Sequence, residues 1–158
     1  MNGATVKEAV NRFGEEATEF MGLLDSAIHG DALLTELQSR LPRLFAMAAA
    51  LPEVSPSNEP ETESMSRDQQ AAVHRAIDGK LPFKSYWEVC EVARPTSPQP
   101  VPGLTLLSDD LADIYIDLHR GFAQSSDVDR VWSWRFSWYT HWGRHAANAL
   151  RAIHDAVT

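Results

Sequence analysis

Residues 132–145 read WSWRFSWYTHWGRH and contain four of the five tryptophans and two of the six histidines of this 158-residue chain. At about 100° per residue, this stretch and its continuation direct apolar side chains to one side of a helix. The apolar stripe consists of Val131, Trp138, Trp142, Ala146, Ala149 and Ile153. The period predicts one long amphipathic helix that begins after a cap at Ser126 or Asp127 and ends near Val157.

Four further segments have helical character. They cover residues 6–28, 34–51, 67–79 and 108–122. Pro42 lies inside the second segment, where we expect a kink or a short break. Ser108 is expected to cap the fourth segment. With about five helices and a length that suits one domain, the sequence predicts an all-α bundle that forms a single helical domain over residues 1–158.

Two proline-rich stretches interrupt the helical pattern. Residues 52–66, PEVSPSNEPETESMS, and residues 94–103, RPTSPQPVPG, lack an apolar period. Such segments cannot bury enough apolar surface to offset the entropy cost of ordering them, so we expect two flexible loops that are most mobile in 55–64 and 95–102. Between the loops, residues 81–89 predict an irregular segment packed on the bundle, with a two-stranded piece as the alternative.

The acidic composition narrows the classes of partner. The chain has 22 acidic and 14 basic residues, for a formal net charge of −8. Nucleic acids and anionic membranes both select basic surfaces, so we expect neither as a partner. The longest nearly apolar run, residues 44–51, is far shorter than the roughly 18 residues of a membrane span. The N-terminal residues also lack a signal-peptide pattern, and we expect a cytoplasmic protein.

Arg135 falls at the centre of the apolar stripe when the last helix is drawn with a regular period. Burial of a guanidinium is very costly unless a carboxylate pairs with it. Asp110, Asp113 and Asp117 recur at steps of three and four along one flank of the preceding predicted helix. We therefore expect Arg135 to be buried and paired with one of these aspartates. The alternative is that the aspartates face solvent.

His141 and His145 are four residues apart, so both rings project from the same side of the last helix. This spacing suits two ligands of a metal ion. The remaining ligands would come from the three aspartates of the preceding helix or from Glu88. The alternative is a buried polar network in which both histidines bond to carboxylates or to the backbone.

Any functional pocket is expected between the last two helices, where ionisable and aromatic residues come together. The candidate residues of this pocket are Asp110, Asp113, Asp117, Trp134, Arg135, His141 and His145. The sequence by itself predicts no metal, but if one binds, we expect His141, His145 and Asp113 to hold it. There is no glycine-rich phosphate loop and no nucleophile elbow, and we expect no cofactor.

Two blocks of the sequence resemble a known family. These are LLSDDLADIYIDL at 106–118 and WSWRFSWYTHWGRHAANALRAIH at 132–154, with weaker support from RLPRLFAMAAALP and SYWEV. They are similar to a bacterial domain-of-unknown-function family, number 5063, with Trp138 at a position where phenylalanine is expected. The resemblance covers most of the chain. It implies a single helical domain and leaves the activity open.

The sequence lacks the common catalytic motifs, and its tryptophan-rich helix lies beside a polar cluster. These features favour a non-catalytic module that binds a protein or a peptide, as an adaptor or an immunity-type inhibitor. The alternative is a metal-assisted hydrolase, in which His141, His145 and two of the aspartates hold the ion and Arg135 steadies an anionic substrate. A weaker alternative is a small-ligand sensor that uses the same pocket.

Overall fold

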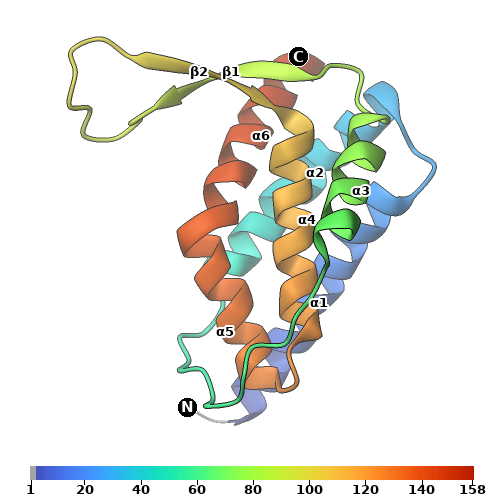
Figure 1. Cartoon of the computed structure of the whole chain (residues 1–158), viewed down its shortest axis with the longest axis vertical. Helices are drawn as coiled ribbons and strands as arrows, with labels where there is room; N and C mark the ends of the chain where they lie inside the picture. The colour runs from blue at the N-terminus through green and yellow to red at the C-terminus, as the bar shows by residue number, and fades with distance from the viewer. Residues whose placement is uncertain (1–2) are drawn as a thin grey trace.

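The computed structural model describes residues 3–158, with side chains from residue 5 onward. Its elements are α1 (Gly3–Asp25), α2 (Gly30–Ala49), α3 (Arg67–Asp78), β1 (Ser85–Cys90), β2 (Val101–Leu106), α4 (Leu107–Ala123), α5 (Asp127–Ser137), the π-helical turn η1 (Trp138–Trp142) and α6 (Gly143–Val157). Because α5, η1 and α6 follow one another directly, the described residues form five helical rods and one hairpin (Figure 1). The predicted all-α bundle is confirmed.

The rods enclose one apolar core. α4 lies between α3 and α6, with α1 and α2 behind them (Figure 1). The largest fully buried side chains are Phe13, Phe20, Leu33, Leu34, Leu37, Leu41, Leu44, Leu107, Leu111, Ile114, Trp134 and Trp142. Full burial of one such side chain contributes about 1.5–3 kcal/mol. The helical spacing of these residues therefore explains why the rods form and which faces they turn inward.

Two helices differ in detail from the sequence-based expectation. α2 runs through Pro42 as one helix, so the expected break does not occur. Buried Leu41 and Leu44 on either side of Pro42 hold it against the core, which offsets the lost hydrogen bond. α4 begins at Leu107, and its preceding residue makes no side-chain cap, so Ser108 is not the cap. Instead, the Leu107 N–H donates to the Lys84 carbonyl at 3.0 Å.

The hairpin replaces a segment that was expected to be irregular. β1 and β2 pair antiparallel, with Trp87 opposite Leu104 and Val89 opposite Pro102. The two-stranded alternative for residues 81–89 is therefore correct in part: this segment supplies β1, and its partner β2 begins in the last residues of the predicted proline-rich loop. Pro102 is tolerated because each strand of a two-stranded sheet has a free edge that needs no N–H donor. The hairpin extends sideways beyond the end of the bundle (Figure 1).

Residues 52–66 contain neither helix nor strand, as predicted, but they are tied to the bundle. The segment runs along the outside of the bundle to α3 (Figure 1). Asp129 accepts hydrogen bonds from the N–H of Ser57 at 2.8 Å and from its hydroxyl at 2.7 Å. Further along, the Ser64 hydroxyl lies 2.6 Å from Nδ1 of His119. The flexibility of this loop stays a prediction.

Trp134 belongs to the core and not to the polar cluster beside which it was expected. Its ring packs between Phe13 and Phe122, with both centroid distances at 5.0 Å. The indole N–H donates to the Leu118 carbonyl at 3.0 Å. Gly121 makes this approach possible, because a Cβ at that position would overlap the indole. Trp134 therefore joins α5 to α1 and α4 and supports the site without lining it.

Candidate metal site

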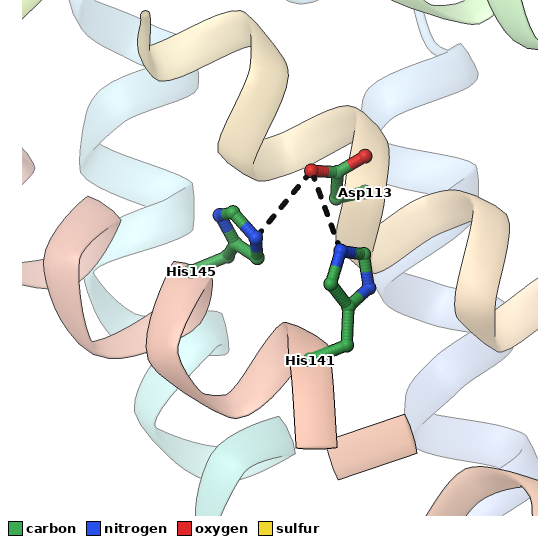
Figure 2. A group of neighbouring side chains, drawn as sticks. All are labelled: Asp113, His141 and His145. Carbon is green, nitrogen blue, oxygen red and sulfur yellow. Dashed lines mark ion pairs between the residues drawn. The ribbon is translucent and has the colours of Figure 1, made fainter. Parts of the chain in front are cut away.

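The site lies between α4 and the junction of η1 with α6. Asp110, Asp113 and Asp117 line the side of α4 that faces this junction, as their spacing predicted. His141 comes from η1 and His145 from α6, and both rings point toward Asp113 (Figure 2). The structure thus brings together five of the seven candidate residues.

Asp113 and the two histidines form the centre of the site. Asp113 Oδ2 lies 3.5 Å from Nε2 of His145 and 3.8 Å from Nε2 of His141 (Figure 2). One ligand atom from each residue lies within 4.8 Å of the others. An ion about 2.1 Å from two ligands at tetrahedral or octahedral angles holds them roughly 3.0–3.4 Å apart. The two distances from Asp113 to the histidines are therefore close to the spacing that a bound ion requires.

The other ring nitrogen of each histidine is bonded to a buried carboxylate. His145 Nδ1 lies 2.7 Å from Asp110 Oδ1, and His141 Nδ1 lies 2.7 Å from Asp117 Oδ2. Only 2% of each of these aspartate side chains is exposed. A carboxylate accepts a hydrogen bond from the Nδ1–H group and leaves the Nε2 lone pair free, which fixes the tautomer that binds a metal. Both free nitrogens then face Asp113.

Each buried aspartate is held in turn by one further side chain. Arg120 donates to Asp117 Oδ1 at 2.7 Å from within α4. The Tyr86 hydroxyl, on β1, donates to Asp110 Oδ2. The two histidines are thus backed by two similar chains of contacts. We call them the His141 branch (His141, Asp117 and Arg120) and the His145 branch (His145, Asp110 and Tyr86).

The charges at the site favour an added cation. Burial raises the pKa of Asp113 above its ordinary value, although His145 and His141 act in the opposite direction. The hydrogen bond to Asp110 raises the pKa of His145, against the effect of burial. A buried carboxylate whose charged form is disfavoured gains most from a nearby positive charge. A divalent ion between Asp113 and the rings would supply that charge.

Arg135 lies elsewhere, so its expected pairing with the aspartates is wrong. Its guanidinium donates to the Leu51 carbonyl at 3.3 Å and lies 4.8 Å from the ring centroid of Tyr139. The side chain is only partly buried, because aromatic packing and one carbonyl replace the carboxylate. Arg135 therefore cannot steady a substrate at Asp113.

The π-helical turn η1 explains the positions of Trp134 and Arg135. A π turn closes i→i+5 hydrogen bonds and so contains an extra residue compared with an α-helical turn. A projection that assumes 100° per residue across this turn therefore assigns the side chains before the turn a wrong direction relative to those after it. In the structure, Trp134 and Trp142 both face the core, and Arg135 lies on the flank.

Several contacts around the site were not predicted. Tyr86 and Arg120 complete the two branches, and His74 on α3 lies 3.1 Å from Asp109, one turn before Asp113. Glu88, a candidate ligand in the sequence, instead accepts a hydrogen bond from Asn148 at 2.7 Å. The alternation in residues 85–90 could have indicated an inward-facing Tyr86, since it places every second side chain on one face.

The molecule is thus a helical bundle that carries a cluster of two histidines and one aspartate between two of its helices. Its sequence matches the family described as a domain of unknown function (DUF5063) over residues 4–158, and the chain belongs to this family. The resemblance noted in the two late sequence blocks is confirmed. The family description assigns no activity, so the function rests on the geometry of the site.

A crystal structure of protein BF1032 from Bacteroides fragilis has a similar fold. The TM-score is 0.78 at 20% sequence identity, over 95% of this chain and 92% of that chain. At this identity the likeness shows the fold alone, and its source agrees with a bacterial family. The comparison with curated proteins gives no match. Among the described residues, no helix is both long enough and apolar enough to span a membrane.

Proposed function

We propose that this protein binds a divalent transition-metal ion through Asp113, His141 and His145 and uses it in a hydrolytic reaction. One observation carries the proposal. Each histidine bonds a buried carboxylate through Nδ1, while the two Nε2 atoms converge on one oxygen of Asp113. Such carboxylate–histidine pairs are the usual support of metal-binding imidazoles.

A purely structural polar network would satisfy both nitrogens of each ring with hydrogen bonds. Here the Nε2 atoms lie 3.5 and 3.8 Å from Asp113 Oδ2, beyond the 2.7–3.2 Å of an N–H···O bond. The same separations suit ligands that share an ion. The bonds to Asp110 and Asp117 are those of the polar network that the histidine spacing also allowed. The positions of the two Nε2 atoms support a metal site built on that network.

The number and type of ligands favour a reactive site. Structural zinc sites are closed by four protein ligands, whereas catalytic sites use three and keep a position for water. The donors here are two imidazoles and one carboxylate, a set that suits zinc or ferrous iron. The His141 side chain is 45% exposed and that of Asp113 is 28% exposed, so water and substrate can reach the centre. A zinc ion held by these residues would lower the pKa of a bound water to about 7 and so would supply hydroxide.

The test is metal binding by the untagged protein. Zinc or cobalt should bind with one ion per chain, and Asp113→Asn should remove that binding. Asp109→Asn is the matched control, because Asp109 lies one turn earlier on α4 and contacts His74 instead of the centre. Hydrolysis of a panel of activated esters and phosphoesters by the loaded protein then tests the reaction. A wild-type chain that binds neither ion overturns the proposal.

The hairpin favours a second candidate function, the binding of a peptide. Trp87 and Leu104 pair across the strands and are 71% and 64% exposed, and both strands have an unpaired edge. Extended peptides bind such edges by adding a strand. The net charge of −8 favours a peptide in which apolar and basic residues alternate.

A synthetic peptide of this alternating composition provides the test of peptide binding. Replacement of Trp87 and Leu104 by serine should abolish binding, whereas Tyr139→Ser, at an exposed aromatic residue of η1, should not change it. Equal binding by both variants would show that the hairpin face is not the binding surface.

A further inference from the structure

The hairpin contacts the candidate metal site through alternate residues of β1. Tyr86 and Glu88 are half-buried and face the bundle, whereas Trp87 and Val89 between and beyond them are exposed. Tyr86 donates its hydroxyl hydrogen to Asp110 on α4, and Glu88 accepts from Asn148 on α6 at 2.7 Å. One strand is therefore joined to both helices that build the site.

The contact of Tyr86 reaches the metal-binding ring through a single carboxylate. Asp110 uses Oδ2 for Tyr86 and Oδ1 for Nδ1 of His145. The Asp110 side chain is almost fully buried, so water cannot readily replace either partner. Without the Tyr86 hydroxyl, the carboxylate would lose one of its two fixed bonds. The orientation of His145 would then rest on one hydrogen bond.

Glu88 and Asn148 keep the strand in place. Asn148 follows His145 by three residues on α6, so the Glu88 contact lies beside the same ring on the helix surface. The partner strand β2 leads directly into α4, which begins at the residue after β2 ends. The three attachments join the hairpin to both α4 and α6, the two helices that carry Asp110 and His145.

On the basis of the proposed metal site, we infer that Tyr86 is a positioning residue of that site and that docking of the hairpin sets the affinity of the His145 branch for the ion. When the hairpin is docked, Asp110 holds His145 with Nε2 directed at Asp113. When the hairpin is displaced, Asp110 and His145 gain freedom to rotate and the ion is held less tightly. The docked hairpin thus stabilises the orientation of His145 that binds the ion.

The decisive comparison is between two tyrosines. Tyr86→Phe removes the hydroxyl that binds Asp110, and Tyr115→Phe removes a hydroxyl that donates to Asp25 at 3.0 Å, away from the centre. Zinc affinity is measured for the full chain by competition with a chromophoric chelator. Loss of an outer-shell contact lowers metal affinity by about 10–100-fold. We expect that loss for Tyr86→Phe and unchanged affinity for Tyr115→Phe.

A double substitution tests whether Tyr86 acts through Asp110. In an Asp110→Asn background, Tyr86→Phe should cause a much smaller further loss of zinc affinity, because the relay is already altered. Thermal unfolding without metal identifies any variant that fails to fold. Glu88→Ala removes the acceptor for Asn148 without changing the contact of Tyr86 with Asp110, and it should lower the affinity in the same direction. Wild-type affinity in Tyr86→Phe overturns this inference. It leaves the metal site itself intact, whereas absence of zinc binding in the wild type overturns both.

Discussion

The two branches of the candidate metal site differ in where their support comes from. His141 is 45% exposed, and both of its supporting residues, Asp117 and Arg120, belong to α4. His145 is 17% exposed, and its outermost support, Tyr86, comes from the hairpin. The more exposed ring thus depends on a single helix, whereas the more buried ring depends on a segment that extends away from the bundle.

This difference follows from how each contact forms. Asp117 and Arg120 are three residues apart, so the formation of helix α4 is enough to bring their side chains together. Tyr86 and Asp110 meet only after the hairpin has folded back on α4. Local contacts survive partial loosening of a fold, and contacts between separate elements do not. The His145 branch should therefore be the half of the site that responds to changes elsewhere in the molecule.

The largest predicted effect is the loss of either ring. His141→Gln and His145→Gln should each lower zinc affinity by more than the roughly 100-fold upper range of outer-shell changes, because each removes a ligand. His145→Gln should also lower the melting temperature of the metal-free protein, since it leaves buried Asp110 short of a donor. His141→Gln removes the equivalent donor from buried Asp117, so it should also lower the melting temperature, but by less, because the more exposed His141 ring contributes less packing. Chelator competition and thermal unfolding measure both quantities, and a variant with wild-type affinity would exclude that ring as a ligand.

The second prediction compares the stability of asparagine variants at the two buried carboxylates, Asp117 and Asp110, which have different outer partners. Asparagine at 117 has a single acceptor oxygen. It would either direct an N–H at the Arg120 guanidinium, which can only donate, or direct it at Nδ1 of His141 and force the other ring tautomer. Asparagine at 110 would meet the Tyr86 hydroxyl, which can also accept. Asp117→Asn should therefore destabilise the metal-free protein by about 1–3 kcal/mol, the cost of an unsatisfied buried group. Asp110→Asn should cost less, as measured by chemical denaturation, and the reverse order would show that the branches are not supported as described.

The sequence predicted the parts of the molecule that depend on a local period. Steps of three and four residues identified the helices, and the same rule placed Asp110, Asp113 and Asp117 on one side of α4. The four-residue spacing of His141 and His145 predicted that both rings project from one side of their helix, and the structure places that side opposite Asp113. A regular helix carries such information because its geometry repeats.

The remaining parts depend on packing between elements. The π-helical turn changes the rotation of the rod, and its main signal in the sequence is Gly143, where a Cβ would overlap the Trp138 carbonyl. The sequence around Arg135 and Trp134 does not show where the regular helical period changes, so their directions could not be predicted. The Tyr86 contact joins the hairpin to the bundle, so no residue spacing within either element could reveal it.

The third prediction concerns the metal-free protein and pH. The hydrogen bond to Asp110 raises the pKa of His145 above its ordinary value of about 6.5. A raised pKa in the folded state stabilises the protein below the unfolded-state pKa, and this contribution is lost as the pH rises through the folded-state pKa. With chelator present, the free energy of unfolding should fall as the pH rises from the unfolded-state pKa to the folded-state pKa of His145. Asp110→Asn should lower the pKa of His145, which NMR titration of the ring can follow, and an unchanged pKa would mean that Asp110 does not control His145.

The smallest predicted effect tests the outer end of the His141 branch. Arg120 is 39% exposed and also lies 4.0 Å from Glu61, so water can take over part of its role when it is removed. Arg120→Gln should therefore lower zinc affinity by less than about 10-fold, below the usual range for an outer-shell contact. Tyr86 joins the hairpin to Asp110, whereas Arg120 contacts Asp117 within one helix, so the loss of Tyr86 should cost more even though arginine carries the charge. Chelator competition on the two variants side by side gives the comparison. If Arg120→Gln lost more affinity than Tyr86→Phe, the charge of Arg120 would outweigh the contact between the hairpin and Asp110, and the His141 branch would be the one that controls the ion.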